Sequence, residues 1–457
     1  MKHNISKKNW IFSANLLLLF FVFMLPSCKK YLDAKTDKSL VIPSTLEDAQ
    51  AVLDNYQGMN QFFPSVSNIS DDNFYITESY FNSQNLTYQN YYTWDKNALD
   101  EIDWNYMYGI VLNADIAIET VDKQPPSIVN SAKALNIKGE AFFFRALGLY
   151  NVVQYYTSPY DSVAASTTLG VPLRLTSDAS IVSKRASLQE SWDQITSDMT
   201  LATHLLALNN SIASRPCKIS AYAALAGIYL DMGKYKQALF YADSSLLLND
   251  TLIDYNTEDA TQLYPFGRFN IEVLFSSVSQ YPGMLSPTNY KVDSMLYNSY
   301  DSNDLRRKLF FTPKGAGTIG FRGSYDGSNA PFNGYATDEV YLIKAECEAR
   351  EGLIESAMAT LNKLIVTRWK TNTFQPFTAT TVDEALNKIL TERRKELIQR
   401  SRRWFDLRRL NKDPRFAKTL TRIENGITYT LPPADPRYVF LIPAQVIDIT
   451  GMQQNSR

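Results

Sequence analysis

Hydrophobic residues recur at helical spacing along most of the chain. Between residues 132 and 156 they fall at alternating intervals of four and three: Phe142, Ala146, Leu149, Val153 and Tyr156. This spacing places them on one face of a long α-helix. A similar pattern between residues 99 and 121 predicts a second helix. The pattern therefore indicates a mostly α fold.

Two later segments repeat each other in the spacing of their packing residues. The offsets are those of a tetratricopeptide unit: Leu225, Ala226, Tyr229, Gly233, Tyr235, Ala238 and Ala242 in the first segment, and Ile343, Lys344, Gly352, Ile354, Ala357 and Leu361 in the second. Small residues let antiparallel helices approach closely, and Gly233 and Gly352 permit the turn between them. One such hairpin cannot bury its own face, so it must stack on others.

We therefore expect a scaffold of tetratricopeptide-like helical hairpins in one domain that spans residues 43–457. The hairpins are expected near residues 100–156, 188–248, 335–366 and 382–412. Residues 249–331 differ, because Gly, Pro, Ser, Asn and Tyr are frequent and apolar residues occur only in short runs. We expect a loop-rich insertion with short strands there, and such insertions on a rigid scaffold often carry binding residues.

The first 27 residues have the pattern of a secretory signal peptide. Three lysines precede an apolar run from Leu16 to Leu25, which is shorter than the roughly 20 residues that span a bilayer. The junction Leu25-Pro-Ser-Cys28 resembles a bacterial lipobox, which predicts that Cys28 is lipidated and that residues 28–42 form a polar tether. Each buried acyl methylene would contribute about 0.8 kcal/mol to membrane anchoring. The alternative is an ordinary cleaved signal with a cysteine nearby.

Charge and residue content exclude several classes of function. Removal of residues 1–27 would take three Lys from the 46 basic residues and none from the 47 acidic ones, leaving a net charge near −4 and no reason to expect a nucleic-acid partner. His204 would be the only histidine left. A structural zinc site needs about four Cys or His ligands and a serine triad needs a histidine beside its nucleophile, so the sequence disfavours both. We expect no metal, no cofactor and no catalytic residue. Cys217 and Cys347 could form a disulfide, but two buried thiols in helical segments are favoured.

Several stretches of the chain resemble the SusD/RagB family of Bacteroidetes surface lipoproteins. They are the start Cys28–Asp33, the signature helix Lys138–Leu147 followed by Gly170–Leu173, the hairpins Ala221–Ala242 and Glu339–Asn362, and the near-terminal motif Glu392–Leu397 with Arg403–Arg409. Arg400 and Ser401 replace a usual Glu-Gly pair. The ending from Val439 to Asn455 is similar to the closing strand and Gln-Asn tail of the family, without its usual Asn-Pro.

This resemblance implies a SusD-like fold and a role in nutrient uptake. It implies a protein that is anchored to the outer membrane through lipidated Cys28 and binds an oligo- or polysaccharide at the cell surface. The ligand would be delivered to a SusC-like, TonB-dependent transporter, over which the protein acts as a lid. Binding of a peptide, as in the RagB branch, is the alternative. In neither case does the resemblance imply catalysis.

Aromatic residues are the candidates for ligand contact. The chain has 28 Tyr, 24 Phe and 6 Trp, and a tyrosine ring can stack on the apolar face of a sugar while its hydroxyl bonds the rim. Two clusters supply the candidates: Tyr75, Tyr80, Phe81, Tyr88 and Tyr91 in the first, and Tyr281, Tyr290, Phe321 and Tyr325 in the second. Trp94, Trp104 and Tyr108 are assigned to packing.

Two other classes of function stay open. A surface glycosidase would need two carboxylates that face each other across the scissile bond, and a tetratricopeptide adaptor would bind another protein. Glu140 and Asp406 lie in helical motifs, where a buried ion pair or a cap is the simpler account. In the near-terminal helix we expect the pairs Glu392–Lys395 and Glu396–Arg400. Trp404 and Phe405 are expected to anchor that helix in the core.

Overall fold

The structure is a computed structural model that describes residues 43–457, so the predicted signal peptide, Cys28 and the tether lie outside the described residues. Residues Ser44–Arg457 form one compact unit. Among the described residues, no helix is both long enough and apolar enough to cross a membrane.

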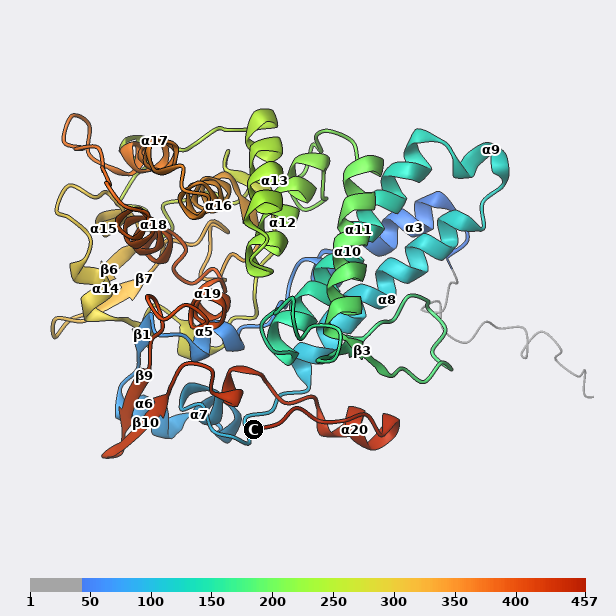
Figure 1. The fold of residues 1–457 in the computed structure, drawn as a ribbon, viewed down its shortest axis with the longest axis horizontal. Helices are drawn as coiled ribbons and strands as arrows, with labels where there is room; N and C mark the ends of the chain where they lie inside the picture. Colours follow the sequence, from blue (N-terminus) through green and yellow to red (C-terminus); the bar gives the residue numbers. More distant parts are fainter. Residues whose placement is uncertain (1–42) are drawn as a thin grey trace, which may run out of the picture. The chain divides into compact units, whose positions relative to one another are not determined.

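The first part of the scaffold is built on two long helices, α8 (Ile102–Asp122) and α10 (Ala132–Tyr156), which pack against each other. Helix α3 (Leu46–Leu53) packs on α8 and α11 (Leu188–Leu205) on α10 (Figure 1). Local sequence sets where these helices begin. Thr45 with Asp48 and Ser187 with Glu190 form capping boxes that satisfy the free N–H groups of α3 and α11.

The second part of the scaffold is a series of helical hairpins. Its helices are α12 (Lys218–Asp231), α13 (Tyr235–Leu248), α16 (Thr337–Arg350), α17 (Ile354–Ile365), α18 (Val382–Glu396) and α19 (Arg403–Leu410). Helix α12 packs on α13, α13 on α16, and α16 on both α17 and α18. Gly233 and Gly352 have φ angles of 70° and 82°, so both turns need the left-handed conformation that glycine adopts freely.

The remaining elements are short. They are the helices α4 (Tyr56–Met59), α5 (Val66–Ser70), α6 (Glu78–Ser83), α7 (Leu86–Tyr92), α9 (Pro126–Val129), α14 (Ser294–Asn298), α15 (Arg306–Leu309) and α20 (Ala444–Thr450), and the 3-10 helices η1 (Tyr255–Thr257), η2 (Gly283–Leu285), η3 (Val366–Arg368) and η4 (Pro436–Tyr438). The predicted mostly α, SusD-like fold class is confirmed. The prediction of a closing strand after Val439 is wrong. Helix α20 occupies this segment, and no strand forms between residues 439 and 455.

Strands in the described residues form two-stranded antiparallel pairs. These are β1 (Phe74–Tyr75) with β5 (Lys291–Val292), β2 (Leu169–Pro172) with β3 (Arg185–Ser187), β4 (Val273–Phe275) with β8 (Tyr335–Ala336), β6 (Phe311–Pro313) with β7 (Ile319–Phe321), and β9 (Leu420–Glu424) with β10 (Ile427–Leu431). Asn425 and Gly426 join β9 to β10, and both have a positive φ, as a two-residue hairpin turn requires. Residues 249–331 contain four of these strands (β4, β5, β6 and β7) and no helix longer than five residues.

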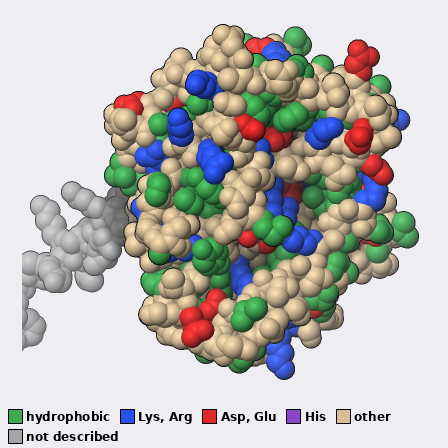
Figure 2. Space-filling view, turned by 90° about the vertical axis from the view of Figure 1, so that its left-hand side faces the viewer, with side chains coloured by type: hydrophobic (Ala, Val, Ile, Leu, Met, Phe, Trp, Pro, Cys, Tyr) green, Lys and Arg blue, Asp and Glu red, His purple; other side chains and the backbone are tan. Residues whose placement is uncertain are grey.

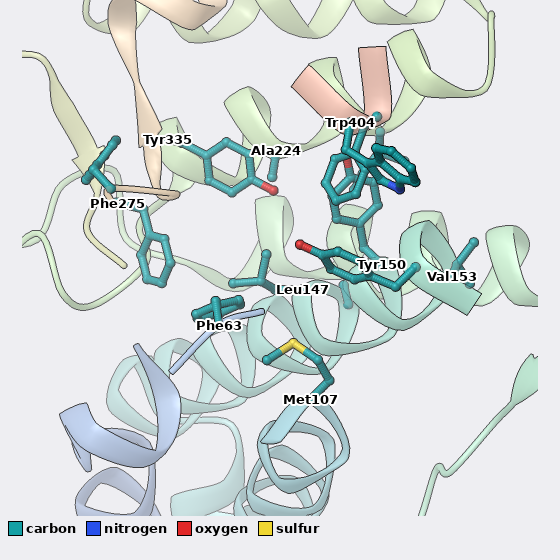
Figure 3. Close-up of a cluster of buried hydrophobic side chains, with 14 of the residues drawn as sticks. Phe63, Met107, Leu147, Tyr150, Val153, Ala224, Phe275, Tyr335 and Trp404 are labelled. Carbon is teal, nitrogen blue, oxygen red and sulfur yellow. The ribbon is translucent and has the colours of Figure 1, made fainter. Parts of the chain in front are cut away.

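One hydrophobic core joins the scaffold to the irregular region. Leu147, Tyr150 and Val153 on α10 lie beside Met107 on α8, with Ala224 of α12 and Trp404 of α19 on the other side (Figure 3). Phe275 of β4 and Tyr335 of β8 extend this cluster into the loop-rich part. Trp404 is fully buried and Phe405 is buried beside it, which confirms that they anchor α19.

The near-terminal motif makes buried ion pairs, one of which differs from expectation. Lys395 bonds Glu392 with a nitrogen–oxygen distance of 2.8 Å, as predicted. The predicted pair of Glu396 with Arg400 is wrong, because α18 ends at Glu396 and the chain then turns through Gln399 and Ser401 with positive φ. Arg400 reaches Asp338 instead.

The two carboxylates that were assigned structural roles are both buried. Asp406 pairs with Arg393 and Arg409 at 2.9 and 2.8 Å, which confirms the ion pair. Glu140 has no salt bridge and accepts hydrogen bonds from Gln50 Nε2 and Asn136 Nδ2, each at 2.8 Å. Cys217 and Cys347 are free and buried, as favoured from the sequence.

Glu140 gives a testable pH dependence. Burial raises the pKa of Glu140 to about 7, so its contribution to stability is complete below about pH 4.5 and is lost as the pH rises through 7. In Glu140→Gln this contribution does not titrate. We therefore expect wild type to lose up to about 3 kcal/mol relative to Glu140→Gln between pH 5 and pH 8. Urea denaturation of both proteins at each pH measures this difference, and a difference that does not change with pH would contradict it.

Candidate ligand-binding site

Five of the nine candidate aromatic residues lie in the core. Their side chains are at most 5% exposed: Phe81, Tyr91, Tyr290, Phe321 and Tyr325. A ring with no exposed face cannot stack on a sugar, so the prediction that these five contact a ligand is not supported by their positions.

Each buried ring has a clear packing role. Tyr290 stacks on Phe74 with ring centroids 4.4 Å apart and an angle of 6° between the planes. The Tyr325 hydroxyl lies 2.7 Å from that of Tyr255 and donates to Glu272 at 3.0 Å. Partners of this kind come from distant parts of the chain, so the local composition of a loop does not reveal them.

The other four candidates reach the surface. Tyr80, Tyr88 and Tyr281 are partly buried, and Tyr75 is 40% exposed. Tyr80 lies beside the segment that holds Tyr281, because a Cβ added at Gly283 would lie 3.0 Å from the Tyr80 hydroxyl. Burial raises the pKa of Tyr281, and Tyr264 and Tyr80 add to this shift.

A stacked pair of aromatic rings lies next to these tyrosines. Phe62 stacks on Tyr106 of α8 with centroids 5.2 Å apart, and Tyr106 is 38% exposed. Residues 60–63 run beside residues 276–280, because Gln280 donates its N–H to the Phe63 carbonyl. The Phe62 φ angle of 66° is a left-handed value that costs energy in a bulky residue. Such strain persists where the surrounding structure imposes it, often at ligand sites.

A buried carboxyl group contacts the segment that holds Tyr281. Asp103, in the first turn of α8, accepts a hydrogen bond from Gln280 Nε2 at 3.0 Å through Oδ1, while Oδ2 is buried and has no partner. Burial, reinforced by repulsion from Asp100, holds the pKa of Asp103 well above its usual range. Tyr88 lies close enough for the Asp100 and Asp103 charges to raise its pKa as well, in addition to burial.

We refer to these residues as the aromatic patch: Phe62, Tyr80, Tyr88, Tyr106 and Tyr281 around Asp103 and Gln280. It combines partly exposed rings with the partly exposed amide of Gln280, which can exchange hydrogen bonds with hydroxyl groups and is held by the buried Asp103. This is the pattern of a site that binds a molecule with both apolar faces and hydroxyls.

Tyr75 belongs to a different hollow. A cavity of about 500 Å³ is lined by Tyr75 and Phe74, by β9, and by charged side chains that include Asp72, Lys418 and Arg422. Figure 2 shows this side of the domain, where Lys and Arg side chains lie in and around a hollow. Arg422 is held over the Tyr92 ring, 3.7 Å from its centroid. The hollow is therefore more charged than the aromatic patch.

Sequence reasoning missed four residues of the aromatic patch: Phe62, Asp103, Tyr106 and Gln280. The helical spacing of Ile102, Tyr106 and Ile110 predicts that Tyr106 lies on the hydrophobic face of this helix, whereas Tyr106 is 38% exposed. Asp103 carries no local signal, because its burial follows from the contact with Gln280, 177 residues away. In the described residues no group of three or more His, Cys, Asp or Glu side chains could hold a metal ion.

The fold and the patch together define a helical-hairpin protein with an irregular face suited to ligand binding. Residues 30–230 match a family described as starch-binding and associating with the outer membrane, and residues 322–440 match the SusD family. The chain belongs to the SusD/RagB family. None of the curated proteins matches the chain significantly.

Solved structures share this fold over nearly the whole chain. A SusD superfamily protein from Bacteroides thetaiotaomicron is 21% identical, covers 90% of this chain and 100% of its own, and has a TM-score of 0.74. A putative sugar binding protein from Bacteroides vulgatus is 21% identical, with coverages of 91% and 99% and a TM-score of 0.74. Surface glycan-binding protein A from Bacteroides uniformis is 16% identical, with coverages of 90% and 99% and a TM-score of 0.70.

Proposed function

We propose that this protein binds a carbohydrate at the cell surface through the aromatic patch and delivers it to a SusC-like, TonB-dependent transporter in the outer membrane. The observation that carries the proposal is the stacked, partly exposed pair of Phe62 and Tyr106, which lies in the same region as the Gln280 amide. Family membership and the sugar-binding or glycan-binding descriptions of similar structures support the ligand class. Anchoring through lipidated Cys28 is part of the same proposal.

The chemistry of the patch suits a sugar. Each sugar ring has a face of C–H groups that can stack on Tyr106 or Tyr281 and hydroxyls that need partners. The side chain of Gln280 is partly exposed and can provide such a partner, and its amide is held in place by the buried Asp103 carboxyl at 3.0 Å.

Binding measurements on glycans test this proposal. The protein is screened against host, plant and microbial polysaccharides beside a peptide mixture, and the best ligand is titrated by calorimetry. We expect Tyr106→Ala and Tyr281→Ala each to weaken binding about 5- to 20-fold, because each removes one stacking surface. Phe240→Ala is the matched control, since Phe240 is 63% exposed on α13 and remote in sequence from the patch, and we expect it to bind as wild type does.

The same experiment separates the alternatives. Saturable binding of peptides alone would favour a peptide-binding role and reject the carbohydrate. Glycan binding that is unchanged in both tyrosine variants would move the site away from the patch, and the charged hollow beside Tyr75 would be the next region to test with Tyr75→Ala. Release of shortened sugars during the titration would indicate a glycosidase.

A further inference from the structure

A second pocket lies between α8, α20 and the loop that joins β2 to β3. It has a volume of about 370 Å³, and the residues that line it from α8 are Trp104, Tyr108, Leu112 and Asp115. Val446 and Ile449 of α20 form another wall, and Ile181 and Val182 of the loop a third. Figure 1 shows these three segments near one another. We refer to it as the α8–α20 pocket.

This pocket is separate from the aromatic patch although both use α8. In a helix of 3.6 residues per turn, positions 103 and 106 point to one side, whereas 104, 108, 112 and 115 lie within about 80° of one another on a different side. The residues that line the two sites are different. One helix therefore supports two sites.

The walls of the pocket are held in place by satisfied polar groups. The Tyr108 hydroxyl donates to the Pro172 carbonyl at 2.8 Å, so its ring is fixed beside Trp104, with centroids 4.8 Å apart. Arg174 donates to the carbonyls of Ile181 and Asp178, at 2.6 Å each. These bonds fold the loop over the pocket and occupy the Arg174 guanidinium.

One polar atom in the pocket has no partner. Asp115 accepts a hydrogen bond from Arg145 Nη1 at 2.9 Å through Oδ1, but its Oδ2 is buried and accepts none. The Asp115 side chain is only 1% exposed. The Nε and Nη2 groups of Arg145 donate to Asp198, so Nη1 makes its one bond to Asp115. Burial raises the pKa of Asp115 to about 6, so near neutral pH the free oxygen is a hydrogen-bond acceptor. An unpaired buried acceptor is costly, and a ligand donor would remove that cost.

We infer that the α8–α20 pocket binds a small, neutral molecule with an aromatic-sized apolar body and a hydroxyl group that donates to Asp115 Oδ2. Most of the lining is apolar, with Trp104 and the aliphatic side chains of α20 and the loop in contact with the space. A sugar, with hydroxyls on every side, would leave most of them without partners there. The Asp115 carboxylate would repel an anion, and Arg174 at the rim of the pocket would repel a cation.

A pair of probes that differ only in the donor tests the inference. The full chain is titrated with 2-naphthol and with 2-methoxynaphthalene, which has the same rings but no O–H, and binding is followed by saturation-transfer NMR and calorimetry. We expect 2-naphthol to bind at least about 5-fold more tightly, because only it can donate to Asp115. Equal binding of the two probes would overturn the assignment of Asp115.

Three variants locate the binding. Leu112→Trp should fill the pocket and weaken 2-naphthol binding about 10-fold or more. The matched control is Leu201→Trp, on α11, which should leave 2-naphthol binding unchanged. Leu112 and Leu201 are 42% and 40% exposed, so both variant proteins should fold. Asp115→Asn should remove the preference for 2-naphthol over 2-methoxynaphthalene. The amide oxygen of this variant would accept from Arg145, so its NH2 group would face the pocket and could not accept a hydrogen bond from the naphthol O–H. Unchanged 2-naphthol binding by Leu112→Trp would show that the probe binds elsewhere and would reject the pocket.

Discussion

Replacement of Arg368 by Met is expected to lower the free energy of unfolding by about 3–5 kcal/mol. The guanidinium is completely buried and donates to Glu396 at 2.8 Å, to Glu272 at 2.9 Å and to the Ile253 carbonyl at 2.9 Å. Methionine fills much of the same volume but leaves Glu272 in the interior without a cation, and leaves Glu396 with Arg306 as its remaining partner. The cost comes mainly from the unpaired charge of Glu272. Urea denaturation followed by far-UV circular dichroism measures it.

The matched control for this experiment is Arg415→Met. Arg415 also pairs with two carboxylates, Asp413 and Asp383, but its side chain is 44% exposed. Water and salt screen such surface pairs, which contribute about 0–1 kcal/mol. A similar loss in the two variants would show that burial of the Arg368 network does not determine its effect.

The buried network also explains how the irregular region is attached to the scaffold. Arg306, in the loop-rich part, reaches Glu392 and Glu396 of α18, and Arg368 connects the same helix to Glu272 beside β4. The hydrogen bonds of these guanidinium groups have fixed directions, so they set the orientation of the loops on the helices as well as holding them. The aromatic patch depends on this orientation, because Gln280 follows β4 by only a few residues.

The helical scaffold could be predicted from the sequence because its signals are local. The spacing of Phe142, Ala146 and Leu149 specifies one face of α10, and Gly233 and Gly352 mark turns that need a positive φ. In contrast, the loss of the Glu396–Arg400 pair depends on where α18 ends and on the distant Arg306, Arg368 and Asp338. Neither appears in the local spacing of charges.

The candidate site could be predicted only in part. Tyrosine content marked candidates of which Tyr80, Tyr88 and Tyr281 are partly exposed. Content alone does not show which face of a loop packs inward, so Tyr290 and Tyr325 were indistinguishable from Tyr281 until their partners Phe74 and Glu272 were known. The stacking of Phe62 on Tyr106 likewise arises only when residues 60–63 align beside residues 276–280.

Trp404 gives the second large expected effect, because it joins the near-terminal motif to the end of the chain. It is completely buried on α19, and its ring centroid lies 4.8 Å from that of Tyr438 and 5.6 Å from that of Phe440. Trp404→Ala would leave a cavity among these rings, and we expect it to lower the free energy of unfolding by about 3–5 kcal/mol.

The variant Trp404→Phe separates volume from polarity at the same position. The Trp404 Nε1 group is buried without a hydrogen-bond partner, so phenylalanine removes an unsatisfied donor and leaves a much smaller cavity. We therefore expect Trp404→Phe to cost less than half as much as Trp404→Ala when both are compared with wild type by urea denaturation and circular dichroism. Equal losses would mean that the indole N–H, and not the packing of the ring on Tyr438 and Phe440, stabilises this part of the core. In that case the N–H must have a partner in solution, and the end of the chain would be held by a hydrogen bond as well as by packing.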